Sequence, residues 1–267
     1  MNPPIGVTLT SAATAFDRVA NSYDAQFTHT SIGRAQREQV WSALLATFPE
    51  GSRILELNCG TGEDARFLAK QRRSVVACDA SAVMIEVAKR HGGRPDYLRM
   101  ANEELSSLYA ETPFDGAFSN FSGLNCMADL SPVARSLARL VKPGGRILIC
   151  IWGRVCVAEI LWYLLRGQPR KAIRRFHGKS VAKLGGLDIS ISYHTLREVH
   201  RAFSPWFGLK SRRAVGLFVP PSYAERWMAR QPVALAYFEK LDRVFAGWPL
   251  LRNFGDHILL EFLRCNP

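Results

Sequence analysis

The spacing of hydrophobic residues changes along the chain between a pattern typical of helices and one typical of buried strands. Residues 11–27 and 33–48 repeat their apolar positions every three to four residues, which predicts two amphipathic helices. Short apolar runs then alternate with helical patterns. The predicted strands are residues 53–58, 74–78, 95–99, 114–119 and 146–152, and the predicted helices are residues 62–72, 81–91, 102–109 and 131–141. Such alternation is typical of βαβ units and predicts a parallel sheet covered on both faces.

The pattern changes after Trp152. Residues 154–177 are helical and basic, with a break near Gly167 and Pro169, and residues 187–195 alternate like a half-exposed strand. The remaining predicted helices are residues 196–203, 222–230 and 233–246, and the remaining predicted strands are residues 207–219 and 256–264. Two late strands predict that an antiparallel pair completes the sheet. We expect the helices in 154–177 and 220–252 to cover the strand ends.

These patterns predict an α/β fold with a doubly wound, mostly parallel seven-stranded sheet and an antiparallel last strand. An N-terminal cap helix precedes the sheet, and helical insertions follow in the C-terminal part. Three parts are expected within one structural domain. They are a helical cap at 1–50, a cofactor-binding core at 51–153, and a segment at 154–267 that completes the sheet and forms a basic, aromatic substrate cap.

Residues 54–69, "ILELNCGTGEDARFLA", join a predicted strand to a predicted helix through glycines. Glycine lets the backbone approach a ligand, and a helix N-terminus presents unpaired N–H groups. Asp79, at the end of the next predicted strand, is placed to accept hydrogen bonds from a ribose diol. Asn58 stands where such loops often begin with glycine, and asparagine is enriched among non-glycine residues at positive φ. The loop therefore predicts a nucleotide-like cofactor, and it fits a dinucleotide or S-adenosylmethionine.

Two observations favour S-adenosylmethionine over a dinucleotide. About fifty residues precede the loop, whereas a dinucleotide domain more often begins near its glycines. Glu63 and Asp64 bring negative charge to the helix start, which opposes a pyrophosphate and suits a sulfonium cation. The alternative interpretation of these two acids is the ordinary preference for carboxylates in the first turn of a helix.

Charge is distributed unevenly along the chain. The formal net charge is +12, from 35 Lys and Arg against 23 Asp and Glu. Residues 1–152 hold 16 basic and 15 acidic residues, so residues 153–267 hold 19 and 8, a net charge of +11. The densest stretch, 166–183, has seven basic residues and no acid. It favours an anionic partner or surface, and the alternative is a solvated face whose acids come from elsewhere in the fold.

Cysteine usage and hydropathy limit the class of protein. The six cysteines form no CxxC pair, so we expect buried thiols in a reducing compartment and no metal site. No run of about 18 apolar residues is present, so no membrane span is expected. The first residues lack a basic region followed by an apolar core, which argues against a secretory signal. A cytoplasmic protein is the resulting expectation.

Four segments in this order resemble the class I S-adenosylmethionine-dependent methyltransferases, which have a Rossmann-like fold. They are "ILELNCGTGE" (54–63), "VVACDASAVMIEVAK" (75–89), "FDGAFSNF" (114–121) and "LARLVKPGGRILICIWG" (137–153). Residues 15–27, "AFDRVANSYDAQF", also resemble the N-terminal cap helix of the ubiquinone/menaquinone-type methyltransferases. The resemblance covers about residues 50–153. The sequence departs from the family at Asn58 and at "RMANEE" (99–104), which shifts the adenine contact by up to a residue.

The resemblance implies a role in cofactor binding for the loop, the strand ends and the cap helix. The residues implied are Tyr23, Glu56, Asn58, Cys59, Gly60, Gly62, Asp79, Ala80, Met84, Asn102, Glu103, Asn120 and Phe121. Among them, Asp79 would take the ribose hydroxyls. Either Asn102 or Glu103 would bind the exocyclic amine of adenine.

Catalytic groups are harder to assign, because methyl transfer from a sulfonium depends mainly on positioning. Some acceptors also need a base. His257, beside Asp256, is one candidate, although such a pair at the start of a strand also forms simply as a local hydrogen bond. Tyr193 and His194 are further candidates in the cap. A capping or turn role is the alternative for His194.

The leading hypothesis is an S-adenosylmethionine-dependent methyltransferase acting on a small organic or lipid-like acceptor that is apolar or anionic. A second hypothesis keeps the cofactor but makes the acceptor RNA or an acyl chain on a carrier protein, attracted by residues 166–183. No RNA-binding module is visible, so this hypothesis ranks lower. A nicotinamide-dependent oxidoreductase and a non-catalytic cofactor-binding protein at a membrane surface are the remaining alternatives.

Overall fold

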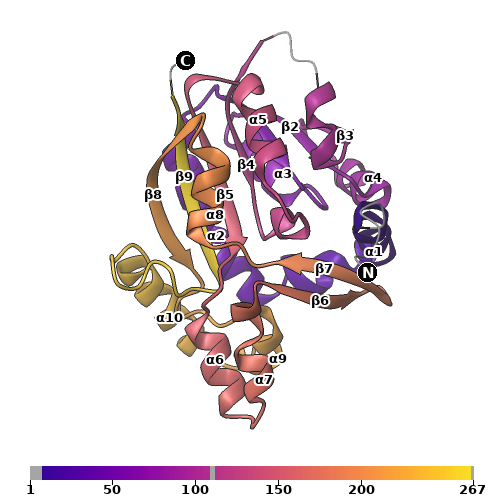
Figure 1. The fold of residues 1–267 in the computed structure, drawn as a ribbon. Helices are drawn as coiled ribbons and strands as arrows, with labels where there is room; N and C mark the ends of the chain where they lie inside the picture. Colours follow the sequence, from indigo (N-terminus) through magenta and orange to yellow (C-terminus); the bar gives the residue numbers. More distant parts are fainter. Residues whose placement is uncertain (1–7, 109–111, 266–267) are drawn as a thin grey trace, which may run out of the picture.

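Seven strands form one sheet in the order β3-β2-β1-β4-β5-β9-β8 in the computed structural model, which describes residues 8–108 and 112–265 (Figure 1). The strands are β1 (Arg53–Leu57), β2 (Ser74–Asp79), β3 (Asp96–Arg99), β4 (Phe114–Ser119), β5 (Val141–Trp152), β8 (Phe207–Val215) and β9 (His257–Arg264). The first five are parallel, and β9 lies antiparallel between β5 and β8. The predicted fold class is confirmed.

Helices cover both faces of this sheet, because successive strand residues point to opposite sides. Leu55 and Leu57 pack in a core with residues of α5 and α8, whereas Ile54 packs in a second core with residues of α2 and α3. The helices of this part are α2 (Ser31–Thr47), α3 (Glu63–Lys70), α4 (Ala82–Arg90), α5 (Ser131–Leu140), α8 (Leu196–Phe203) and the short 3₁₀ helices η2 (Asn102–Ser107) and η3 (Gly123–Cys126). Residue 109, the last of one predicted helix, lies outside the described residues.

The N-terminal helix differs in detail from the prediction of one helix over 11–27. Helix α1 (Thr8–Tyr23) continues into a π-helical turn, η1 (Asp24–Thr28). Ala20 of α1 packs with Met84 of α4, so α1 lies beside α4 at the end of the sheet that carries β3 (Figure 1). Residues 1–7, on which the expectation about a secretory signal partly rests, lie outside the described residues.

A two-stranded hairpin, β6 (Lys179–Leu184) with β7 (Leu187–Ser192), stands apart from the main sheet. Strand β7 was predicted, but β6 was not, because every second residue of β6 is exposed and "KSVAKL" has little hydrophobic signal. The pair Gly185-Gly186 between the strands is a hairpin signal that sequence reasoning missed. Its left-handed φ values of 55° and 78° form the turn.

The remaining helices lie at the lower end of the molecule in Figure 1. They are α6 (Val157–Leu164), α7 (Pro169–Ala172), η4 (Arg174–His177), η5 (Ser222–Ala224), α9 (Glu225–Met228) and α10 (Pro232–Phe245). The break predicted near Gly167 and Pro169 separates α6 from α7. None of the helices among residues 8–108 and 112–265 is long and apolar enough to cross a membrane.

Candidate functional site

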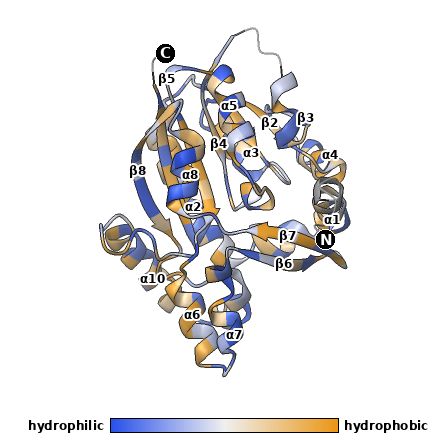
Figure 2. Cartoon of the chain, in the orientation of Figure 1, coloured by the Kyte–Doolittle hydropathy of each residue, from blue (hydrophilic) through white to orange (hydrophobic). Residues whose placement is uncertain are grey.

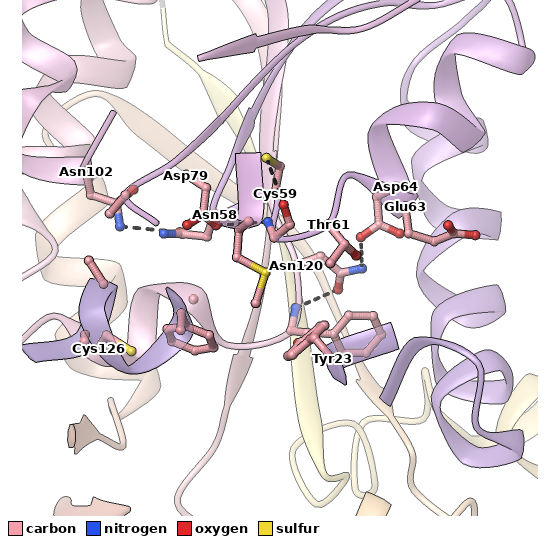
Figure 3. A pocket seen from close by; sticks show the side chains of 18 of the residues that line it. Tyr23, Asn58, Cys59, Thr61, Glu63, Asp64, Asp79, Asn102, Asn120 and Cys126 are labelled. Atoms are coloured by element: carbon pink, nitrogen blue, oxygen red, sulfur yellow. Dashed lines mark hydrogen bonds between the residues drawn. The ribbon is translucent and has the colours of Figure 1, made fainter. Parts of the chain in front are cut away.

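A pocket opens at the carboxyl ends of β1, β2 and β4, with a free volume of ≈ 960 Å³ that includes its open mouth (Figure 3). It is enclosed by α1, α2, the loop after β1 and the segment after β4. Most residues predicted to bind a cofactor line it: Tyr23, Asn58, Cys59, Gly60, Asp79, Ala80, Met84, Asn102, Glu103, Asn120 and Phe121. The fold thus brings together residues that are spread over 99 positions of the sequence.

The glycine loop takes the conformation that its sequence predicts. Gly60 has a φ of 54°, and a Cβ built on it would meet no atom within 4 Å, so this glycine faces open space. Its N–H donates to Oδ2 of Asp79 at 2.9 Å, and the N–H of Ser81 donates to Oδ1 at 2.9 Å. Burial raises the pKa of the Asp79 carboxyl, and these two N–H groups oppose that rise. Asp79 is therefore fixed against the loop at the edge of the pocket.

The backbone of Asn58 lies in the left-handed region, with a φ of 56°, as predicted. Its Oδ1 accepts hydrogen bonds from Oγ of Ser119 at 3.2 Å and from Nδ2 of Asn102 at 3.4 Å. A Cβ on Gly123 would lie 2.3 Å from the Cβ of Asn58, so the asparagine packs directly on η3. Asn58 consequently connects the ends of β1 and β4 with η2, a role that a glycine there would not fill.

Glu56 and Gly62 are the two predicted cofactor residues that do not line the pocket. Glu56 is 1% exposed, and its Oε2 has no hydrogen-bond partner. Burial, and then the charge of Asp64, raise the pKa of Glu56 well above its usual range. Gly62 begins α3 at a φ of 76°, and a Cβ there would lie 2.6 Å from the hydroxyl oxygen of Tyr97. Packing against Tyr97 therefore requires the glycine.

A buried polar cluster beside the loop joins the predicted residue Asn120 to Asp64, Arg37 and Trp41, which were missing from the predicted site. Asp64 is 4% exposed and accepts from Nη1 of Arg37 at 2.6 Å, from Nε1 of Trp41 at 2.7 Å and from Nδ2 of Asn120 at 2.9 Å. The sequence indicated Asp64 either as negative charge suited to a sulfonium or as an ordinary acid of a helix start, and Asp64 does lie in the first turn of α3. Arg37 lies three residues before Val40 and four before Trp41, so it shares the apolar face of α2 with them. A charged residue on an apolar helix face was the sequence signal that could have identified this cluster.

Aromatic rings form another wall of the pocket. The ring of Phe121 lies 5.0 Å from that of Phe27, which lies 5.7 Å from that of Tyr23. Phe121 and Ser122 both have positive φ, at 45° and 66°, which is costly for residues with a side chain. Ser122 is held there by its N–H, which donates to the carbonyl of Cys150 at 3.0 Å. The strained backbone turns the Phe121 ring into the pocket.

Comparisons with known proteins agree with this geometry. The family described as "Methyltransferase domain" matches residues 54–145. The demethylmenaquinone methyltransferase of Mycobacterium marinum is 32% identical over 166 residues, which cover 60% of this chain and 69% of that protein. The enzyme of the same name from Paenarthrobacter aurescens is 32% identical over 171 residues, covering 61% of this chain and 64% of that protein. A third, from Clavibacter sepedonicus, is 34% identical over 51% of this chain and 55% of its own length.

This chain belongs to the class I S-adenosylmethionine-dependent methyltransferases. The chain spans less than two thirds of the length of the first curated relatives that it matches. S-adenosylmethionine is the cofactor of the family.

Solved structures share the methyltransferase fold. One from Listeria monocytogenes, a putative S-adenosylmethionine-dependent methyltransferase, aligns with a TM-score of 0.58 at 16% identity, over 85% of this chain and 98% of that one. The 1,6-didemethyltoxoflavin-N1-methyltransferase of Burkholderia thailandensis aligns at 0.56 and 15% identity, over 100% and 94%. The cyclase SpnF aligns at 0.62 and 15% identity, over 97% and 98%. One of these neighbours is named a cyclase, so the fold alone does not set the reaction.

His257, the first candidate base of this methyltransferase, lies behind the pocket wall. It is 3% exposed, and its ring lies 5.4 Å from that of Phe121 and 5.8 Å from that of Trp152. Its Nδ1 lies 3.5 Å from Oδ2 of Asp256 and forms no hydrogen bond. Burial lowers the pKa of His257 to about 4, so the imidazole is neutral at pH 7. The Phe121 ring separates it from the pocket.

Tyr193 and His194 lie at a second pocket, formed by the hairpin and the start of α5. His194 has its Nε2 3.0 Å from the carbonyl oxygen of Met127, and burial lowers its pKa. The hydroxyl of Tyr193 accepts from Oγ of Ser180 at 3.3 Å. The three candidate catalytic residues therefore do not share one pocket, and their catalytic role stays a prediction.

The second half of the chain places buried polar groups in a network of its own. Nη2 of Arg175 lies 2.7 Å from both Oε2 of Glu159 and Oδ1 of Asp256, and Nε of Arg174 lies 2.9 Å from Oε1 of Glu159. Two cations of the basic stretch 166–183 are thus paired inside the fold. Of the described residues after Met127, none lines the pocket at β1, so the aromatic residues expected to line an acceptor site from this half do not reach it.

Proposed function

We propose that this protein transfers a methyl group from S-adenosylmethionine to a small apolar acceptor with a quinone-like ring. Family membership supports the cofactor. The observation that carries the proposal is the pocket itself, in which an open glycine, a fixed carboxylate and an aromatic wall meet at the carboxyl ends of parallel strands, where ligands of such sheets bind. The names of the related demethylmenaquinone methyltransferases favour the ring-shaped acceptor.

The residues present fit this cofactor. Each oxygen of Asp79 accepts one backbone N–H, and a carboxylate has about four lone-pair sites, so it retains capacity for two ribose hydroxyls. The open side of Gly60 leaves room for a ligand that any side chain there would fill. Ala80 and Met84 would pack against the adenine, and either Asn102 or Glu103 would bind its amine.

Charge in the pocket favours a cationic cofactor over a pyrophosphate. Among the described lining residues, Glu63, Asp64, Asp79 and Glu103 are acidic, and Arg37 is the one basic side chain. A sulfonium and an ammonium group are attracted to such a site, whereas the phosphates of a nicotinamide cofactor are repelled.

The cofactor, when bound, supplies a methyl group already activated by its sulfonium. The protein then has to orient the acceptor and exclude water. Phe121, which Phe27 supports edge-to-face, would pack on an apolar ring, and Tyr23 would cover the site. Burial raises the pKa of Tyr23 to about 12, so this hydroxyl keeps its proton at neutral pH. His257 would accept a proton from the acceptor only if the Phe121 ring moved aside.

Calorimetric titration with S-adenosylhomocysteine tests the cofactor, and Asp79→Ala is the informative variant. We expect binding by the native protein and a loss of roughly 100-fold in the variant, since two hydroxyl contacts of about 1.5 kcal/mol each to a charged group disappear. A folded native protein without binding contradicts the proposal. Transfer of labelled methyl to a demethylated quinol, with total RNA as the alternative acceptor, then identifies the acceptor class.

A further inference from the structure

Helices α6 and α9, at the lower end of the molecule in Figure 1, carry exposed apolar and cationic side chains. Leu161, Leu164 and Leu165 are 55%, 50% and 87% exposed, and Trp227 is 51% exposed. We call this surface the α6–α9 patch, and we define it by Leu161, Leu164, Leu165, Arg166, Arg226, Trp227 and Arg230. Side chains of this size are rarely left in water together without a function.

The cations of the patch surround a shallow aromatic groove between α6 and α9. Arg166, Arg226 and Arg230 line it together with aromatic residues, and no acidic residue is among its described lining residues. The guanidinium of Arg166 lies 3.6 Å from the ring centre of Trp162. These three arginines are exposed, unlike Arg175 of the same half. The groove therefore presents uncompensated positive charge.

One side of helix α6 faces solvent because buried ion pairs fix the opposite side to the rest of the fold. Leu161, Leu164 and Leu165 recur at spacings of three and four residues, so they share one face. Glu159, on the same helix, is 0% exposed and binds Arg174 and Arg175. Figure 2 shows the hydrophobic colour of α6 beside the more hydrophilic α7. The buried ion pairs fix the orientation in which the leucines reach solvent.

We propose that the α6–α9 patch docks this protein onto an anionic lipid bilayer. The leucines and Trp227 would insert at the boundary of headgroups and acyl chains, and the arginines would bind lipid phosphates. Two alternatives fit less well. RNA binding uses aromatic rings and cations but gains little from three exposed leucines. A symmetric dimer would bring the three arginines of one copy against those of the other.

The proposal is independent of the methyl acceptor, because docking needs neither cofactor nor turnover. Flotation with vesicles tests it, using phosphatidylcholine alone and phosphatidylcholine mixed with phosphatidylglycerol at low salt. We expect the native protein to float with the mixed vesicles and to be released by high salt. Failure to bind the mixed vesicles at low salt overturns the proposal.

Two variants of the patch and one control measure separately the contributions of its arginines and its leucines. Each cation near an anionic bilayer contributes about fivefold, so the triple variant Arg166→Gln, Arg226→Gln, Arg230→Gln should bind roughly 100-fold more weakly. The triple variant Leu161→Ser, Leu164→Ser, Leu165→Ser should also lose most of its binding. Lys70→Gln, Lys89→Gln, Arg94→Gln removes the same charge from an exposed surface elsewhere and should retain binding.

Three results would overturn docking through this patch. The first is an equal loss in the control variant, which would mean that net charge alone binds the vesicle. The second is RNA binding that depends on the patch, without vesicle binding. The third is a native dimer by analytical ultracentrifugation that the leucine variant converts to monomer. Melting temperature and S-adenosylhomocysteine binding, unchanged in all variants, establish that each is folded.

Discussion

Up to Met127, polar side chains surround an open pocket, whereas after Trp152 the buried polar side chains of Glu159, Arg175 and Asp256 bind one another. Asp79 and Glu56 retain unused hydrogen-bonding capacity. Arg175 by contrast is 4% exposed and lies between two carboxylates. Burial of charged side chains therefore has two outcomes in this chain. It prepares a ligand site in the first region and fixes the position of added helices in the second.

The match to the family model also separates these two regions of the chain. The matched "Methyltransferase domain" covers residues 54–145, which includes the glycine loop and Asp79 but none of the network around Arg175. In the second region, Arg174 and Arg175 belong to that network, whereas Arg166, Arg226 and Arg230 lie exposed on the α6–α9 patch. If the two regions are independent, substitutions in the first region should change ligand binding, and substitutions in the second should change the stability of the fold.

Arg175→Met should have the largest effect. It leaves Asp256 buried without its arginine and Glu159 paired with Arg174 alone, which costs about 3–5 kcal/mol of unfolding free energy. Urea denaturation measures this loss. Affinity for S-adenosylhomocysteine, measured well below the transition, should stay within threefold or so. A large loss of affinity in folded protein would show that the regions are coupled.

His257 should make stability depend on pH. Its pKa is lowered to about 4 by burial, against about 6.5 in the unfolded chain, so the unfolded state binds more protons between these values. The stabilisation is fully present above pH 6.5 and is lost as the pH falls through 4, by up to about 3 kcal/mol.

His257→Phe preserves the ring beside Phe121 and Trp152 and removes the titration. Unfolding free energies of both proteins between pH 4 and pH 7 should therefore differ in slope. Asp256 and Arg175, which face His257, remain in the variant. An unchanged slope would mean that His257 is not buried as a neutral ring. If methyl transfer in His257→Phe loses its pH profile as well, His257 serves the reaction and the regions meet at Phe121.

Gly60→Val should weaken S-adenosylhomocysteine binding by about 100-fold, equivalent to about 2.7 kcal/mol, because its side chain would fill the open side of the loop. Gly51→Val is the matched control. Gly51 also has a positive φ, of 82°, and open space at its Cβ, but it lies away from this pocket. Both variants should lose similar melting temperature, so normal binding by Gly60→Val would contradict the assignment of the loop.

Gly123→Ala should have the smallest effect, about 1–3 kcal/mol of stability, because its Cβ would overlap that of Asn58. The double variant with Asn58→Gly should recover most of this loss, which a double-mutant cycle measures. Asn58→Gly alone should keep cofactor binding within a few-fold. Additive effects would mean that the two residues do not touch.

The sequence predicted much of the site because those features are local. The left-handed φ of Asn58, the open turn at Gly60 and the position of Asp79 all belong to one βαβ unit, β1–α3–β2. Eleven of the thirteen cofactor residues that the family resemblance implied line the pocket. The exceptions, Glu56 and Gly62, belong to the same unit. Glu56 is buried and Gly62 packs against Tyr97, and hydrophobic periodicity does not distinguish such positions from ones that line the pocket.

Hydrophobic periodicity records which side of each element is buried, so it predicted the order along the chain of the strands of the main sheet and of most helices. The contacts between groups distant in the sequence depend on tertiary packing. Asp64 binds Arg37 from 27 residues away and Asn120 from 56 residues away, and Arg175 binds Asp256 from 81 residues away. The hairpin β6–β7 likewise forms from a strand with little hydrophobic signal. Which buried charged groups pair with one another depends on how whole helices pack. The spacing of residues along the sequence does not predict that packing.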